Sequence, residues 1–173
     1  MNLSRVRVRA GYTAGALALF FAEPTPDSVV AGGVMAILGE MIRLWASGHL
    51  EKTLRLATGG PYAHTRNPLY LGSVLMALGL LVAARHPISV AAGLAYLVLF
   101  YPYIIREEAK FLRDKFSPGY GDWARQVPIF LPRLTPGGPR ESRFQIARLL
   151  ANHEGRSLFG LLVLAAFMVF RLR

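Results

Sequence analysis

Residues with the chemistry of a binding or catalytic site gather in two polar strips. The first strip is residues 59–72, where Arg66, Asn67, Pro68 and Tyr70 lie close together. Pro68 suits the first position of a helix, because its missing N–H would have no partner there. Asn67 then takes the N-cap position, where its side chain can accept a backbone N–H. Because a helix N-terminus beside an arginine favours a carboxylate or a phosphate, this strip predicts a site for an anionic group.

Three residues of the first strip also have a purely structural explanation. Arg66 is also explained as a surface base that sets membrane topology, and Tyr70 as an aromatic anchor at the membrane interface. Gly72 leaves space either for a ligand or for a second helix. The sequence leaves both explanations open for all three.

The second strip, residues 106–116, places two acids side by side on a predicted helix. Adjacent helical residues point about 100° apart, so Glu107 and Glu108 face different sides. Glu108 shares its side with Leu112 and Phe116, and we expect that side to be buried or to face a ligand. Glu107 shares its side with a lysine and an aspartate, which predicts a solvated position. A carboxylate against an apolar face at a membrane edge is costly unless it is paired, so Glu108 is the stronger candidate.

The composition is that of a membrane protein. Of 173 residues, 53% are hydrophobic and 17% are charged, against a usual charged share of about 25%. The mean hydropathy is +0.36, which excludes a disordered chain and argues against an ordinary soluble globule. The chain has no cysteine, which excludes disulfides, zinc thiolates and cysteine nucleophiles. The four histidines lack metal-ligand spacing, so we predict no metal site.

Five uncharged stretches define the apolar elements: 10–22, 28–39, 68–84, 87–105 and 157–170. A helix needs about 17–25 residues to cross the hydrocarbon of a bilayer. The third and fourth stretches are long enough alone, and the first two need flanking residues. The fifth is short, and either spans the membrane or lies along it. We therefore predict an all-α, multi-pass transmembrane helical bundle with four core spans and a short C-terminal apolar helix.

The charges predict the orientation of this bundle. Twenty Lys and Arg against ten Asp and Glu give a net charge of +10. The bases gather before the first span, in residues 43–67 and in residues 106–156, and the positive-inside rule places all three in the cytoplasm. We therefore predict an integral membrane protein, in the inner membrane if the source is bacterial. Because topology explains the bases, we predict no nucleic-acid partner.

Three further segments have competing interpretations. The N-terminal arginines followed by residues 10–22 also fit a signal peptide, although Phe20 makes a poor cleavage site. Residues 144–150 predict a basic amphipathic helix, either on the membrane surface or packed on cytoplasmic loops. Tyr120 and Trp123 predict an interfacial cap, and residues 131–139 are the nearest thing to a linker.

The order of these motifs resembles that of the integral-membrane methyltransferases, the superfamily of isoprenylcysteine carboxyl methyltransferases and phospholipid N-methyltransferases. The residues that carry the resemblance are Gly60-Pro61-Tyr62, the run from Arg66 to Gly72, Glu107-Glu108, Leu112, Phe116, Tyr120, Trp123 and Val127-Pro128. The resemblance covers about 39–133 of a single membrane-embedded domain, 1–173, and residues 134–173 form an amphipathic and apolar helical tail.

The resemblance implies S-adenosylmethionine as cofactor, bound in a pocket on the cytoplasmic side. It also implies a lipidic or hydrophobic methyl acceptor and contact with membrane lipids. By position it assigns the cofactor pocket to Tyr62, Arg66, Asn67, Pro68 and Tyr70, to which we add Gly72. Glu107 and Glu108 match the paired acids of the family, and together with Arg106 they are the predicted catalytic residues. The isoprenylcysteine enzymes usually have histidine where this chain has Asn67, a departure that argues against an isoprenylcysteine substrate.

Methyl transfer suits these residue types, because the protein need only align donor and acceptor and manage charge. Arg66 and the helix start would hold the methionine carboxylate, and a glutamate would hold the ribose hydroxyls or the cofactor amine. Glu108 could accept a proton from an amine acceptor, or Arg106 could hold an acidic one. Two other functions remain open: an NADPH-dependent membrane reductase, since sterol reductases resemble the same C-terminal region, and a non-catalytic lipid-binding protein.

Overall fold

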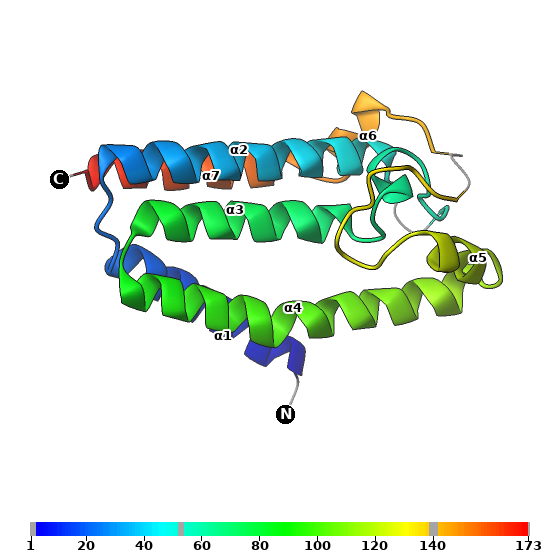
Figure 1. The fold of residues 1–173 in the computed structure, drawn as a ribbon, viewed down its shortest axis with the longest axis horizontal. Coiled ribbons are helices and arrows are strands. Elements are labelled where there is room, and N and C mark those ends of the chain that lie inside the picture. Colours follow the sequence, from blue (N-terminus) through cyan, green and yellow to red (C-terminus); the bar gives the residue numbers. More distant parts are fainter. Residues whose placement is uncertain (1–2, 52–53, 139–141, 173) are drawn as a thin grey trace. The chain divides into compact units, whose positions relative to one another are not determined.

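The chain folds into helices joined by short loops and one long irregular segment. The computed structural model describes residues 3–51, 54–138 and 142–172. Its elements are α1 (Leu3–Phe20), α2 (Pro26–His49), the 3-10 helix η1 (Gly60–Ala63), α3 (Pro68–Ala84), α4 (Pro87–Phe116), α5 (Gly119–Gln126), α6 (Ile146–Ala151) and α7 (Gly155–Phe170) (Figure 1). No strand occurs within these described ranges, so the all-α prediction is confirmed.

Two helices, α2 and α4, are long and apolar enough to cross a bilayer. Only 28% of the most apolar window of α2 and 17% of that of α4 is buried, so most of this apolar surface faces outward. Outward apolar surface is expected of helices that contact lipid and is unusual for the core helices of a soluble protein. Helices α3 and α7 are apolar but shorter, with 17 and 16 residues. By length and composition, two of the four predicted spans are thus candidate membrane spans.

The chain divides into two compact units, and the first is built from small residues. Unit 1 is drawn from the residues up to Leu38, from Val74–Tyr103 and from Phe159 onward. Its core consists of Ala22, Ala83, Ala84 and Met168. Here α2 and α3 lie side by side, because a Cβ added to Gly32 would lie 2.3 Å from the carbonyl oxygen of Gly79 (Figure 1). Small residues of this kind let helix backbones touch, as in membrane helix pairs.

Unit 2 has an aromatic core and carries both polar strips. It comprises Gly39–Ser73 and Ile104–Leu158. Its core residues are Ala46, Ala57, Tyr62, Tyr120, Trp123 and Val127. Tyr120 and Trp123, predicted as an interfacial cap, are each 1% exposed, so protein and not lipid surrounds their side chains. They are buried because they pack against the first strip, which is far from them in sequence.

The irregular segment after α5 runs along the loop that precedes α3. Its backbone accepts hydrogen bonds from the Arg66 N–H at Pro128 (2.9 Å), from the Thr65 hydroxyl at Phe130 (2.8 Å) and from the Asn67 side-chain amide at Ile129 (2.8 Å). Farther along, the N–H groups of Arg133 and Gly137 donate to the carbonyls of His64 and Ala63. The described part of the predicted linker, residues 131–138, is therefore packed against the first strip. Pro139 lies outside the described residues.

Candidate functional site

Arg66 lies one residue before the cap of α3, and one of its donors is buried without a partner. Its Nη1 donates to the hydroxyl of Tyr120 at 3.0 Å, and its guanidinium carbon lies 5.9 Å from the centroid of that ring. Its Nε is buried and has no hydrogen-bond partner. A buried donor without a partner costs about 1–3 kcal/mol, which a bound acceptor would recover. Arg66 is thus oriented by Tyr120 and has a donor available for a ligand.

The start of α3 forms as the sequence predicts. The N–H of Leu71 donates to the carbonyl of Asn67 at 3.0 Å, and Pro68 is the first residue of the helix. Both Asn67 and Pro68 are buried. The side-chain amide of Asn67 has a further role, because its Nδ2 donates to the carbonyl of Ile129. Asn67 therefore ties the helix start to the segment that follows α5.

Gly72 brings α3 against α2. A Cβ at this position would lie 2.5 Å from the carbonyl oxygen of Gly39 and 2.7 Å from Cγ of Arg43. The space that the missing side chain leaves is occupied by α2, which favours the structural explanation of this glycine.

Tyr62 belongs to the aromatic core of unit 2, and its phenol responds to an acid of α4 and to the acid that precedes α7. It is 6% exposed, and its carbonyl accepts a hydrogen bond from Trp123 Nε1 at 3.2 Å. Burial raises the pKa of the Tyr62 phenol, and the nearby Glu108 and Glu154 raise the pKa further, whereas Arg43 opposes them. Tyr70 also contributes to raising the pKa of Tyr62, which places it among the neighbours of that phenol. The phenol therefore stays neutral in a region of net negative charge.

The two acids of the second strip face different environments, as predicted. Glu108 is half-buried, on the side of α4 where Leu112 and Phe116 pack against the core of unit 2. Partial burial raises the pKa of the Glu108 carboxyl, which lies beyond the uncharged stretch of this helix. Arg106 and Glu107 are exposed. The structure therefore places Glu108 on the side of α4 that packs against the core containing Tyr62, and leaves Arg106 and Glu107 exposed.

A buried ionic network beside Tyr62 was not predicted. Arg43, interpreted from the sequence as a topology-setting base, forms a salt bridge with Glu154 at 2.9 Å. Its guanidinium also donates to Ser157 at 3.1 Å and to Ser73 at 2.5 Å. The sequence does contain a signal for the contact between Glu40 and Arg43. These two charges are three residues apart within an otherwise apolar helix. Nothing local in the sequence identifies Glu154 as their partner.

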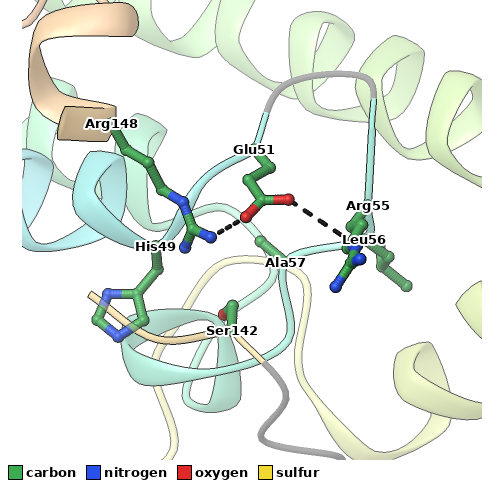
Figure 2. A pocket seen from close by; sticks show the side chains of 7 residues that line it. All are labelled: His49, Glu51, Arg55, Leu56, Ala57, Ser142 and Arg148. Atoms are coloured by element: carbon green, nitrogen blue, oxygen red, sulfur yellow. Dashed lines mark hydrogen bonds and ion pairs between the residues drawn. The ribbon is translucent and has the colours of Figure 1, made fainter. Parts of the chain in front are cut away.

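A small cavity of about 70 Å³ lies at the C-terminal end of α2 (Figure 2). Its lining consists of His49, Glu51, Arg55, Leu56, Ala57, Ser142 and Arg148. Glu51 forms salt bridges with Arg148 and, at 4.0 Å, with Arg55. None of the predicted site residues lines this cavity. Among the residues that the structure describes, no cluster of three metal-ligating side chains was found.

The match to known proteins agrees with the resemblance in the motifs. The sequence model of the phospholipid methyltransferase family matches residues 27–119, just over half of the chain. The protein-S-isoprenylcysteine O-methyltransferase of Saccharomyces cerevisiae is 30% identical over 115 residues, which cover 60% of this chain and 48% of the yeast protein. The probable protein-S-isoprenylcysteine O-methyltransferase of Oryza sativa subsp. indica is 34% identical over 113 residues, which cover 58% of this chain and 59% of that protein.

A bacterial relative is named for metal resistance and not for methyl transfer. The cobalt-zinc-cadmium resistance protein CzcN of Cupriavidus metallidurans is 37% identical over 114 residues, covering 64% of this chain and 52% of that protein. The chain thus spans about half the length of the curated relatives it matches. No solved structure matches the chain. The family match and the named relatives show that the chain belongs to the phospholipid methyltransferase family, within the integral-membrane methyltransferase superfamily.

Proposed function

We propose that this protein is an enzyme that transfers a methyl group from S-adenosylmethionine to a lipidic or hydrophobic acceptor at the cytoplasmic face of a membrane. Family membership supports the reaction class. The observation that carries the cofactor site is the unpartnered, buried Nε of Arg66 beside the N-terminus of α3. An arginine donor and a helix start together suit a carboxylate, and the methionine part of the cofactor has one.

The residues around Tyr62 fit the rest of this cofactor. S-adenosylmethionine, when bound, supplies a methyl group activated by its positively charged sulfur. Arg66 and the start of α3 would hold the carboxylate, with Asn67 and Pro68 building that helix start. Tyr62 and Tyr70 would line the pocket, and Glu108 would accept hydrogen bonds from ribose hydroxyls or from the amine. The role we propose for Gly72 is to let α3 pack against α2, which supports the pocket without lining it.

Residues of the second strip would bind the methyl acceptor or remove its proton. Glu108 would accept a proton from an amine acceptor as a general base. Arg106 and Glu107 are exposed, so we place them at the outer edge of the site, where Arg106 would hold an acidic acceptor. The main contribution of the protein to catalysis is then alignment of donor and acceptor, because oriented reactants avoid much of the entropy cost of the reaction.

The membrane supplies the acceptor in this proposal. We place four spans in α1 to α4, with the N-terminus and the regions 43–67 and 106–156 on the cytoplasmic side, in the inner membrane if the source is bacterial. The outward apolar surface of α2 and α4 and the distribution of the bases support this topology. A lipid acceptor would then reach the site from within the bilayer.

Calorimetric titration of S-adenosylmethionine into the detergent-purified protein tests the proposed cofactor. Arg66→Ala should lower the affinity about tenfold or more, because hydrogen bonds to charged groups contribute about 1.5–3 kcal/mol. Arg113→Ala removes an equal charge from the exposed side of α4 and should leave the affinity unchanged. If the folded wild-type protein binds no S-adenosylmethionine, the proposal is wrong. Titration of NADPH then separates a reductase from a non-catalytic lipid-binding protein.

A further inference from the structure

The ionic network beside Tyr62 contains more acid than base. Its charged members are Glu40 and Arg43 of α2 and Glu154, which immediately precedes α7; we call them the Glu40–Arg43–Glu154 cluster. The side chain of Glu40 is 4% exposed and that of Glu154 is 7% exposed. Arg43 lies 3.7 Å from the Glu40 carboxylate and 2.9 Å from that of Glu154. In the described parts of the chain, these are the salt bridges that either acid makes.

One carboxylate oxygen of this cluster has no partner. The hydroxyl of Ser157 donates to Oε2 of Glu40 at 2.7 Å, but Oε1 of Glu40 is buried without a hydrogen bond. An unsatisfied charged oxygen away from water costs more than a neutral one. Two buried carboxylates that share a single guanidinium also leave one negative charge uncompensated. Both observations point to a missing positively charged group.

The cluster lies against the start of α3, because Arg43 donates to the Ser73 hydroxyl and its Cγ would be 2.7 Å from a Cβ at Gly72. Glu154 and Arg43 are both close enough to Tyr62 to shift the pKa of its phenol, in opposite directions. Glu154 comes from the helical tail, outside the matched residues 27–119. The tail therefore contributes a charged residue to the surroundings of Tyr62.

We propose that the Glu40–Arg43–Glu154 cluster is a subsite for an organic cation, either a sulfonium or an ammonium group, and that the C-terminal tail completes it through Glu154. The identity of the cation as a reactant rests on the proposed function. A sulfonium would come from the methyl donor, and an ammonium from an amine acceptor. If it is the sulfonium, the subsite also favours turnover, because the donor loses its positive charge on transfer and the neutral product is held less tightly.

Glu40→Gln is the most informative variant. Glutamine has nearly the same volume, and its carbonyl oxygen can still accept the hydrogen bond from Ser157, so the main change is the loss of charge. Asp114→Asn is the matched control, because it removes the same charge from an exposed position on α4. Both variants are titrated with S-adenosylmethionine and with S-adenosylhomocysteine. The second lacks one methyl group, and its sulfur carries no positive charge.

A second probe tests the subsite without the cofactor. Thermal melts of the detergent-purified protein with tetramethylammonium, and with neutral tert-butanol of similar size, report binding of the cation alone. Glu154→Gln provides a second variant in case Glu40→Gln does not fold, and the same selectivity is expected of it. A structural role for either acid would lower the melting temperature without changing the preference for charged over neutral ligands.

Each outcome decides the proposal. We expect Glu40→Gln to lower affinity for S-adenosylmethionine about tenfold and to leave S-adenosylhomocysteine within about twofold, because charge interactions are strong in partly desolvated sites. That result assigns the cation to the donor. Unchanged affinity for both, with loss of stabilisation by tetramethylammonium, assigns it to an amine acceptor. If charged and neutral ligands are affected equally in every assay, no cation subsite exists. If wild-type protein binds neither cofactor form, the proposed function fails, but the tetramethylammonium melts still test the subsite.

Discussion

The two units of this molecule are stabilised by different kinds of contact. In unit 1, glycine and alanine let helices touch, and serine hydroxyls donate to backbone carbonyls, as Ser28 does to Ala83 and Ser89 does to Ala18. Unit 2 has a core built around Tyr120 and Trp123, and it also holds buried charged groups that are only partly satisfied. Unit 1 has the contacts expected within a bilayer, where burial of apolar groups drives association little. Unit 2 has the unsatisfied polar atoms expected of a binding site.

The largest effect should come from the aromatic core of unit 2. Trp123→Ala removes a side chain that is 1% exposed and a hydrogen bond to the Tyr62 carbonyl. We expect it to lower the free energy of unfolding by about 3–5 kcal/mol and to abolish cofactor binding. Trp45→Ala is the control. Because Trp45 is 45% exposed, its substitution should lower the free energy of unfolding far less. Denaturant titration in detergent measures both; equal losses would mean that the core is not where stability resides.

The contact between α2 and α3 in unit 1 should respond to a single methyl group. Gly32→Ala places its Cβ 2.3 Å from a backbone oxygen, so the helices must separate, at a cost of about 1–3 kcal/mol. Gly33→Ala is the matched control, because a Cβ there meets nothing within 4 Å and alanine favours the helix. Thermal melts should therefore show a loss for Gly32→Ala and a small gain for Gly33→Ala. A gain for both would contradict the close packing of these helices.

Glu108 should affect ligand binding more than stability. Glu108→Ala removes a half-buried carboxylate from beside Tyr62, and we expect an affinity for S-adenosylmethionine that is about tenfold lower. Asp114→Ala removes an exposed carboxylate from the same helix and should leave the affinity within about twofold. Calorimetric titration distinguishes the two. Full affinity in Glu108→Ala would remove this residue from the proposed site.

The parts that the sequence predicts are those that depend on neighbours along the chain. Helical spacing correctly separates Glu108 from Glu107, and Pro68 correctly marks the start of α3. The sequence does not predict the salt bridge between Arg43 and Glu154, which are 111 residues apart. Such a contact depends on how the helices pack. A single charge in an apolar helix indicates that a partner is needed, but it does not indicate which residue that partner is.

The long segment after α5 shows the same limit. Its prolines and glycines are typical of a linker, yet its backbone pairs with the loop before α3. The aromatic residues Tyr120 and Trp123 suggest the membrane interface by composition, but they fill the core around Tyr62. In both cases the partner lies more than fifty residues away, so only the folded chain reveals it.

Transfer of a labelled methyl group tests the central claim most directly. Membranes that contain the wild-type protein are incubated with S-adenosylmethionine labelled in its methyl group, and the label is then measured in the organic-solvent extract. We predict that wild-type membranes label extractable material, and that Arg66→Ala membranes do so at least tenfold less, because they lack the carboxylate contact. Arg113→Ala membranes should match wild type. Equal labelling by wild-type and Arg66→Ala protein, or no labelling by folded wild-type protein that retains its membrane lipids, would contradict the account.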